Sequence, residues 1–271
     1  MSEVKARAYA KINLFLRVLS AENGYHTIES LNQSVDLFDE IVLSKTEGGV
    51  TSDFAGDNSL VVLSRIAEAY SLGGMHLSVK KNIPIGGGLG GSSADAAAAA
   101  VACAELWGLD LKEVKQLVAP LFGDLAFQMT GGTAVTRGFG EKVEVLPPLP
   151  EYYALLCFPK SGVSTKEAYA LSNKTPKGTG DLRALYEALA CGKRAQKYYV
   201  NDLLPAAEQL NDEIAPLLAS MEDEKSLLTG MSGSGSTLFS LYASREDALK
   251  KRDRLGANAI VVSTIDPFCA K

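Results

Sequence analysis

Residues 84–94 combine glycine and serine in a pattern suited to binding phosphate. The segment reads Pro-Ile-Gly-Gly-Gly-Leu-Gly-Gly-Ser-Ser-Ala and runs into an alanine-rich stretch at residues 96–100. Glycine lets a ligand approach the backbone N–H groups closely, and the first turn of a helix offers unpaired N–H donors with a partial positive charge. The pattern therefore predicts a phosphate-binding loop that opens a helix. The alternative is a flexible linker before a buried helix.

Two common phosphate motifs do not describe this loop. A P-loop requires Gly-Lys-Ser/Thr at its end, and residues 84–94 contain no lysine. A dinucleotide fingerprint can be placed on Gly86, Gly88 and Gly91, but the acidic residue expected about twenty positions later is matched only loosely by Asp110. The positive charge that a phosphate needs must therefore come from another part of the chain.

Composition limits the class of protein. A chain of 271 residues with 46% hydrophobic residues can form one large or two modest domains. A net charge of -5 argues against a protein that binds nucleic acid or an anionic membrane, and favours a small-molecule ligand. The cysteines are widely spaced and the first residues form no apolar signal, so we expect free thiols in a cytoplasmic protein, with neither a disulfide framework nor a zinc site. They are Cys103, Cys157, Cys191 and Cys269.

The order of the expected elements favours an α+β fold. Apolar spacing predicts a helix over residues 59–72, alternation predicts a strand over 75–79, and the glycine loop follows that strand. Further helices are expected at 111–121 and 206–221. Residues 147–150, Pro-Pro-Leu-Pro, form a stiff joint where a domain boundary is expected. Because strands and helices do not alternate strictly, a doubly wound sheet is disfavoured.

Several motifs along the chain resemble one family. The glycine loop is similar to the central motif of the GHMP kinases, which include galactokinase, homoserine kinase and mevalonate kinase. The other matching segments are Ala10-Lys11-Ile12-Asn13, Asn23-Gly24-Tyr25-His26, Val163-Ser164-Thr165 with Tyr169, Asn201-Asp202-Leu203, and Met231-Ser232-Gly233-Ser234-Gly235-Ser236. Together they span almost the whole chain and occur in the family's order.

The resemblance implies a fold and an activity. The fold is the two-domain GHMP-kinase fold, with an ATP-binding domain like ribosomal protein S5 domain 2 at residues 1–150 and a ferredoxin-like, substrate-binding domain at 151–271. The expected activity transfers the γ-phosphate of ATP, with Mg²⁺, to the 2-hydroxyl of 4-diphosphocytidyl-2-C-methyl-D-erythritol, in the non-mevalonate route to isoprenoid precursors. The alternatives are another GHMP kinase, acting on homoserine or a mevalonate derivative, and an inactive relative that senses a ligand. Oligomeric partners and metal ligands are not indicated.

The resemblance also implies the catalytic residues. Lys11 takes the place of the family's active-site lysine and supplies the charge that the glycine loop lacks. Asp124 takes the place of the catalytic base, where the family reads Gly-Ala-Asp-Val-Pro. Here the glycine is shifted by one position, to Gly123, and Ala126 replaces the proline. The alternative is that Asp124 only caps a turn.

Binding residues follow from the same resemblance. Aromatic and polar side chains are expected to recognise the cytidine and the alcohol of the substrate: Asn13, Tyr25, His26, Thr165 and Tyr169. His26 has the alternative of a structural histidine, and Thr165 that of a helix N-cap. ATP is expected to contact the glycine loop and two flanking residues: Pro84, Ile85, Gly86, Gly87, Gly88, Leu89, Gly90, Gly91, Ser92, Ser93, Ala94, Asn58 and Lys81. Lys81 has the alternative of a solvated strand end, and residues 231–236 that of a simple turn.

Overall fold

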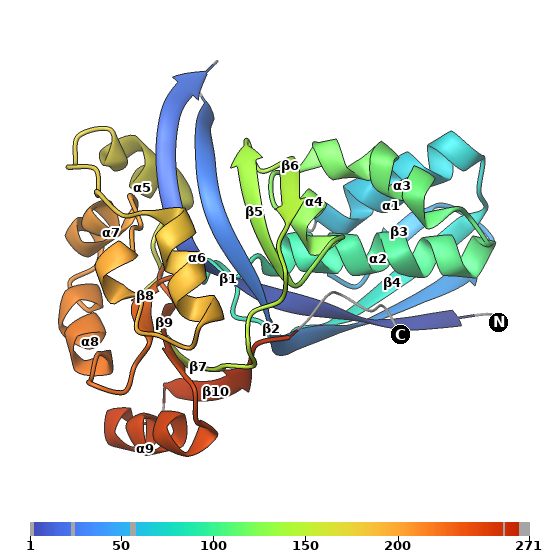
Figure 1. Ribbon diagram of the computed structural model, residues 1–271. Coiled ribbons are helices and arrows are strands. Elements are labelled where there is room, and N and C mark those ends of the chain that lie inside the picture. Colours follow the sequence, from blue (N-terminus) through green and yellow to red (C-terminus); the bar gives the residue numbers. More distant parts are fainter. Residues whose placement is uncertain (1–2, 23–24, 55–57, 257, 266–271) are drawn as a thin grey trace.

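Two β-sheets organise the molecule. The computed structural model describes residues 3–22, 25–54, 58–256 and 258–265, and the side chains of residues 20–22 and 25 lie outside that description. Figure 1 shows the N-terminal sheet and its helices on one side and the C-terminal sheet with its helices on the other. The chain passes from the first sheet to the second between residues 145 and 153. The expected domain boundary at residue 150 stays a prediction.

The first sheet is mostly antiparallel. It contains β1 (Glu3–Glu22), β2 (Tyr25–Thr46), β3 (Val50–Ser52), β4 (Gly74–Lys80), β5 (Thr133–Gly138) and β6 (Lys142–Val145). Strand β2 pairs with β1, β4 and β5, while β3 and β4 are parallel. The mixture of mainly antiparallel strands and helices confirms the predicted α+β class.

Helices cover one face of this sheet: α1 (Asn58–Tyr70), α2 (Gly91–Trp107), α3 (Leu111–Val118) and the short α4 (Leu125–Gln128). Helix α2 is buried along most of its length, because its alanines are small enough for close packing against β1 and α1. On β1, Ala10 and Ile12 belong to this core, and Lys11 and Asn13 alternate with them along the strand. The period of the strand thus places Lys11 and Asn13 on one surface.

The second sheet has the strand order β10-β7-β9-β8 and is antiparallel. Its strands are β7 (Tyr153–Cys157), β8 (Leu228–Met231), β9 (Leu238–Tyr242) and β10 (Ala259–Ser263). The accompanying helices are α5 (Thr165–Ser172), α6 (Leu182–Ala190), α7 (Leu204–Leu210), α8 (Ile214–Met221) and α9 (Arg245–Leu255). None of the helices in the described ranges has the length and apolar character needed to cross a bilayer.

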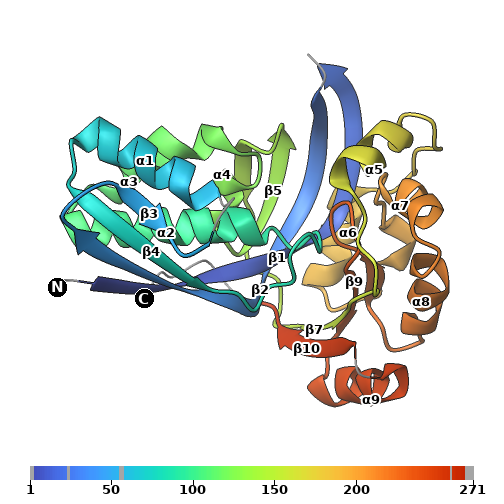
Figure 2. The same cartoon turned by 180° about the vertical axis from the view of Figure 1, so that it is seen from behind.

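The β1–β2 hairpin joins the two halves. It runs along the helices of the N-terminal half and then rises between the two groups of helices, as Figures 1 and 2 show from opposite sides. The amide of Leu16 on β1 donates to the carbonyl of Val200 at 2.8 Å, and the amide of Asp202 donates to the carbonyl of Leu16 at 2.9 Å. The carboxylate of Asp202 accepts from the amide of Val18 at 2.9 Å. The segment at 200–202 therefore fastens this hairpin to the C-terminal half.

One expected helix is wrong in its extent. Residues 206–221 were expected to form a single helix, but α7 and α8 are separated at Asn211, whose backbone is extended. The Asn211 side chain accepts from the amide of Glu213 at 3.0 Å and donates to the carbonyl of Ser161 at 2.9 Å. Asparagine side chains compete with the hydrogen bonds of a helix in this way, and here Asn211 ends α7. The apolar spacing nevertheless continues on both sides of Asn211, which is why the sequence predicted one helix.

Candidate functional site

A cavity of about 370 Å³ lies between the two halves of the molecule. Its walls come from β1, the glycine loop, the first turn of α2, the residue before α4, the start of α5, and residues 231–236, called here the second glycine loop. The volume falls in the range of pockets that bind small molecules, roughly 300 to 1,000 Å³. Catalytic and binding residues expected from separate sequence motifs thus meet at one place.

The glycine loop forms an ordered wall of this cavity. Residues 84–93 line it, and α2 begins at Gly91. Gly90 has φ 71° at the N-cap position, which favours glycine, and a Cβ there would lie 3.0 Å from Cε of Lys11. The loop therefore brings backbone N–H groups and the helix N-terminus to the cavity, as a phosphate-binding loop requires. It is not a linker.

The second glycine loop packs directly against the first. The Ser232 hydroxyl donates to the carbonyl of Gly88 at 2.8 Å, and the amide of Thr237 donates to the carbonyl of Gly87 at 3.2 Å. A Cβ on Gly88 would lie 2.2 Å from the carbonyl oxygen of Ser232, so only glycine fits there. Residues 231–236 are thus a brace for the glycine loop rather than a simple turn.

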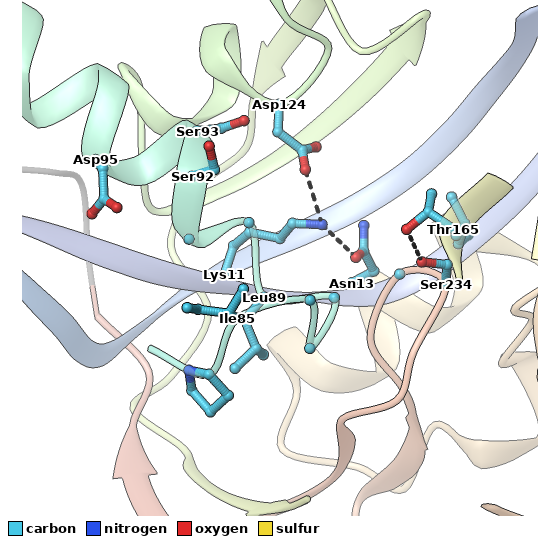
Figure 3. A pocket seen from close by; sticks show the side chains of 18 of the residues that line it. Lys11, Asn13, Ile85, Leu89, Ser92, Ser93, Asp95, Asp124, Thr165 and Ser234 are labelled. Carbon is cyan, nitrogen blue, oxygen red and sulfur yellow. Dashed lines mark hydrogen bonds and ion pairs between the residues drawn. The ribbon is translucent and has the colours of Figure 1, made fainter. Parts of the chain in front are cut away.

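Lys11 and Asp124 form an ion pair in the cavity. Lys11 Nζ lies 3.4 Å from an oxygen of Asp124, and the side-chain exposures of the two residues are 5% and 38%. Figure 3 shows the Lys11 ammonium between Asp124 and Asn13, with Ser93 on the side of Asp124. Lys11 Nζ also donates to Asn13 Oδ1 at 2.6 Å. A cation buried next to a partly open carboxylate suits the transfer of a proton and of a charged group.

The Asp124 carboxylate is available to the cavity. Asp124 occupies the N-cap position of α4, yet its side chain makes no capping hydrogen bond, so the turn-cap alternative does not account for it. The preceding Gly123 packs against the turn between β5 and β6, where an added Cβ would lie 2.4 Å from the carbonyl oxygen of Phe139. This close backbone approach is a local physical reason for the glycine immediately before Asp124.

Lys81 is held by two carboxylates. Its Nζ lies 2.5 Å from oxygens of Asp39 on β2 and Asp95 on α2, whose side chains are both fully buried. Burial alone would lower the pKa of Lys81, but the hydrogen bonds from both aspartates raise it above its usual range. The solvated strand-end alternative is therefore wrong for Lys81, and it describes the exposed Lys80 instead. Because two negative charges surround Lys81, it is not the unpaired cation that the glycine loop lacks.

On the side of the C-terminal half, aromatic and hydroxyl-bearing side chains form the cavity wall. Thr165 and Tyr169 line it, and the Thr165 hydroxyl lies 2.9 Å from that of Ser234. Ser164, not Thr165, is the N-cap of α5. His26 stacks on Tyr169 with ring centroids 5.3 Å apart, and its Nε2 lies 2.9 Å from Asn173 Oδ1. Burial, reinforced by the charge of Asp124, raises the pKa of Tyr169 to about 12, so this residue is a neutral phenol at physiological pH.

Three expected binding residues with described side chains do not line the cavity: Ala94, Asn58 and His26, the last of which lies behind Tyr169. Ala94 is buried in the core, and Asn58 begins α1, where its amide lies 3.4 Å from the Ser92 hydroxyl. Tyr25 begins β2, but its side chain lies outside the described part of the chain, as do Asn23 and Gly24. Ala94 therefore acts through packing of α2, whereas Asn58 stands next to the loop.

Four polar residues that support the site were not predicted from the sequence: Ser30, Asn32, Asp39 and Asp95. All are buried, and each is hydrogen-bonded to a residue of the cavity wall or to its supports. Ser30 and Asn32 alternate along β2, and polar residues at a period of two are a signal that they share a face. Asp39 and Asp95 carry no local signal, because their common partner lies elsewhere in the sequence.

The oxygen donors in the cavity fit a magnesium ion that arrives with a nucleotide. Ser92, Ser93 and Asp124 present oxygen atoms there, and no group of three or more His, Cys, Asp or Glu side chains suited to a metal occurs within the described ranges. Mg²⁺ in phosphoryl-transfer sites is commonly held by one or two carboxylates with substrate phosphates and water, rather than by a cage of protein ligands.

Comparison with known families defines the class. The family model for the N-terminal domain of GHMP kinases matches residues 58–134, and the model for their C-terminal domain matches residues 179–261. The chain belongs to the GHMP kinases, and as a kinase of this family it uses ATP.

Individual relatives narrow the comparison. A 4-diphosphocytidyl-2-C-methyl-D-erythritol kinase of Desulfitobacterium hafniense is 37% identical, covering 92% of this chain and 90% of the relative. A kinase with the same name from Caldicellulosiruptor saccharolyticus is 36% identical, covering 92% and 91%. The crystal structure of a 4-(cytidine 5'-diphospho)-2C-methyl-D-erythritol kinase superposes with a TM-score of 0.82 at 30% identity, covering 96% of this chain and 99% of that one. A homoserine kinase from Cytophaga hutchinsonii shares the fold, with a TM-score of 0.70 at 21% identity, covering 98% and 96%.

Proposed function

We propose that this protein transfers the γ-phosphoryl group of ATP to the 2-hydroxyl of 4-diphosphocytidyl-2-C-methyl-D-erythritol. The observation that carries the proposal is the Lys11–Asp124 pair, which stands between the glycine loop and the aromatic wall of one cavity. The glycine loop is suited to the phosphates of ATP, and the Tyr169 ring in the wall, on which His26 stacks, is suited to a cytosine ring. The names of the relatives support the same substrate.

The roles follow from the positions of the side chains. Asp124 accepts the proton of the substrate hydroxyl, whose oxygen forms the new bond to the γ-phosphorus as the bond to the β-phosphate oxygen breaks and ADP leaves. Lys11 stabilises the negative charge on the phosphoryl oxygens. Mg²⁺, when bound with ATP, neutralises phosphate charge, and Ser92, Ser93 or Asp124 would hold it. These residue roles and the use of Mg²⁺ belong to the proposal, as do the cytoplasmic location and the domain boundary at residue 150.

An acceptor panel tests the activity. We expect ADP release from ATP and Mg²⁺ only with the cytidyl substrate, and not with homoserine or mevalonate. Turnover confined to homoserine or mevalonate would identify another GHMP kinase. Binding of the cytidyl substrate without ADP release would identify a ligand-sensing protein. The paired Lys11 and Asp124 favour a working kinase over a sensor.

The close packing of Gly123 gives a second test. Gly123→Ala places a methyl group against the carbonyl of Phe139, so either the β5–β6 turn or Asp124 must move. A displacement of about 1 Å in a catalytic group can lower turnover by up to about 10²-fold, and we expect kcat to fall toward that extent. Steady-state ADP release measures it. Gly73→Ala is the matched control, because a Cβ there meets nothing within 4 Å. Equal kcat values for the two variants would show that the added methyl group leaves Asp124 in place.

A further inference from the structure

A chain of buried polar side chains lies beneath Lys11 and crosses three strands. Asn13 on β1, Ser30 and Asn32 on β2, and Thr136 on β5 are exposed by 4% or less. We call these four residues the polar chain. Buried polar groups cost free energy unless they are hydrogen-bonded, so the pattern of hydrogen bonds fixes how each group is oriented.

The hydrogen-bond direction along the polar chain is fixed first at Ser30, next to an irregularity in the pairing of β1 with β2. The pairing of β1 with β2 shifts register between Asn13 and Phe15. The Ser30 hydroxyl donates to the carbonyl of Phe15 at 2.7 Å, and the same oxygen lies 3.1 Å from Asn32 Oδ1. A carbonyl oxygen can only accept, and a serine hydroxyl has one hydrogen. Ser30 therefore presents only lone pairs to any further partner.

This polarity dictates how the amide of Asn13 must face. Asn13 Nδ2 donates to Ser30 Oγ at 2.8 Å and to Asn32 Oδ1 at 2.7 Å. Asn32 in turn donates through Nδ2 to the hydroxyl of Thr136 at 2.9 Å, which keeps its own Oδ1 toward Asn13. Both N–H groups of Asn13 point away from Lys11, so its Oδ1 points toward Lys11 and accepts from Nζ at 2.6 Å.

We propose that Ser30 and Asn32 are positioning residues of the phosphoryl transfer: they lock the Asn13 amide so that its oxygen holds the Lys11 ammonium at Asp124. An ammonium is tetrahedral and has three N–H donors. With one directed to Asn13 and one toward Asp124, the direction of the third is also set. A reversed Asn13 amide would instead turn N–H groups toward the ammonium and release it. The inference rests on the proposed function.

The polar chain also gives Asn13 a different role from the one the sequence suggested. Its two N–H groups are engaged by Ser30 and Asn32, and its oxygen by Lys11, with the Ser232 hydroxyl at 3.4 Å. Asn13 therefore acts through Lys11 rather than mainly through its own contact with the substrate. The alternation of Ser30 and Asn32 along β2 follows from the same need, since both must face Asn13.

Single variants test the proposal through kcat. Ser30→Ala and Asn32→Leu each remove an acceptor from Asn13, and each is expected to lower kcat about 10-fold while the KM for ATP changes by less than about 2-fold. Asn32→Asp should restore most of kcat, because one carboxylate oxygen accepts from Asn13 and the other from the Thr136 hydroxyl. Ser240→Ala is the matched control: this buried serine bonds to Thr229 at 2.8 Å in the second sheet, and kcat should not change.

A double-mutant cycle separates positioning from general stability. In the background Asn13→Ala there is no amide to orient, so Ser30→Ala should cause no further loss of kcat. A loss that is the same in both backgrounds, or an unchanged kcat in folded Ser30→Ala and Asn32→Leu, would overturn the proposal. If Asn32→Leu fails to fold, the kcat of Ser30→Ala alone decides whether the positioning role holds, because Ser30→Ala is the milder change.

A readout without turnover keeps this inference distinct from the proposed function. In a crystal structure of Ser30→Ala/Asn32→Leu we expect the Asn13 amide to be rotated and Lys11 Nζ to be displaced from Asp124. An unchanged Asn13 and Lys11 would overturn the positioning role even if no acceptor is phosphorylated. Conversely, if the wild-type protein releases no ADP with any acceptor in the panel, the proposed function is refuted. The positions of Asn13 and Lys11 in the variant crystal structure then still decide whether the polar chain positions Lys11.

Discussion

Asp124→Asn is expected to lower kcat by at least about 10²-fold, because a positioned base contributes roughly 10² to 10⁴-fold to proton transfer. Asparagine has nearly the same shape as aspartate but cannot accept the proton of the substrate hydroxyl. The fold should be unaffected, since the Asp124 side chain makes no cap to α4 and is 38% exposed. ADP release with the cytidyl substrate measures the loss, and far-ultraviolet circular dichroism checks the fold.

The matched control for this variant is Asp110→Asn. Asp110 caps α3, where it accepts from the amides of Lys112 and Glu113, and asparagine is an equally good N-cap. It stands outside the cavity wall, so kcat should stay close to that of the wild type. If Asp124→Asn retained near-normal turnover, Asp124 would not be the base, and the Lys11–Asp124 pair would serve only to hold the lysine.

Lys81→Met is expected to reduce the free energy of unfolding by about 3 to 5 kcal/mol, the usual cost of removing one partner from a buried ion pair. Lys81 is 17% exposed, while Asp39 and Asp95 are fully buried, so the substitution leaves two carboxylates without their shared cation. Asp39 also accepts from the amides of Asn82 and Ile83, which lead into the glycine loop. Urea unfolding with linear extrapolation measures the change.

The neighbouring Lys80→Met is the matched control. Lys80 pairs with Glu40 at the surface, with exposures of 70% and 51%, and such pairs contribute little to stability. The stabilising effect of Lys81 also depends on pH. Because the folded pKa of Lys81 is raised above 10.5, its stabilising contribution is complete below that pH and is lost as pH rises through the higher folded value. Equal unfolding free energies for the two variants would contradict the prediction. They would mean that water or protonation stabilises Asp39 and Asp95 as well as the Lys81 ammonium does.

Much of the site could be predicted because its parts carry local signals. Glycines at the loop mark backbone that a ligand or another loop approaches closely, and Gly88 beside Ser232 bears this out. Lys11 and Asp124 were identified through motifs, and the structure brings them to 3.4 Å. The pair of aspartates around Lys81 could not be found in this way. Asp39 and Asp95 lie 42 and 14 positions from Lys81, and no period or motif links residues that meet only through the tertiary fold.

The fold class was predicted from the order of elements, and the expected helix at 59–72 and strand at 75–79 lie close to α1 and β4, but the length of β2 was not predicted. Residues 35–44 have the apolar pattern of a strand, whereas β2 extends from Tyr25 to Thr46. The added part is polar at Ser30 and Asn32, and it is held as a strand by pairing with β1 and β5 and by the polar chain. Sheet pairing and side-chain hydrogen bonds between distant segments override local hydrophobic pattern here.

The contact between the two glycine loops means that the proposed nucleotide-binding loop depends on residues from both halves of the chain. Ser232 and Thr237, in the connection between β8 and β9 of the second sheet, support Gly88 and Gly87 of the loop between β4 and α2. A chimeric protein that combines the N-terminal half of one relative with the C-terminal half of another must therefore keep the backbone conformation of residues 231–236 as well as that of the glycine loop. The two loops form one structural unit, although 144 positions of sequence separate Ser232 from Gly88.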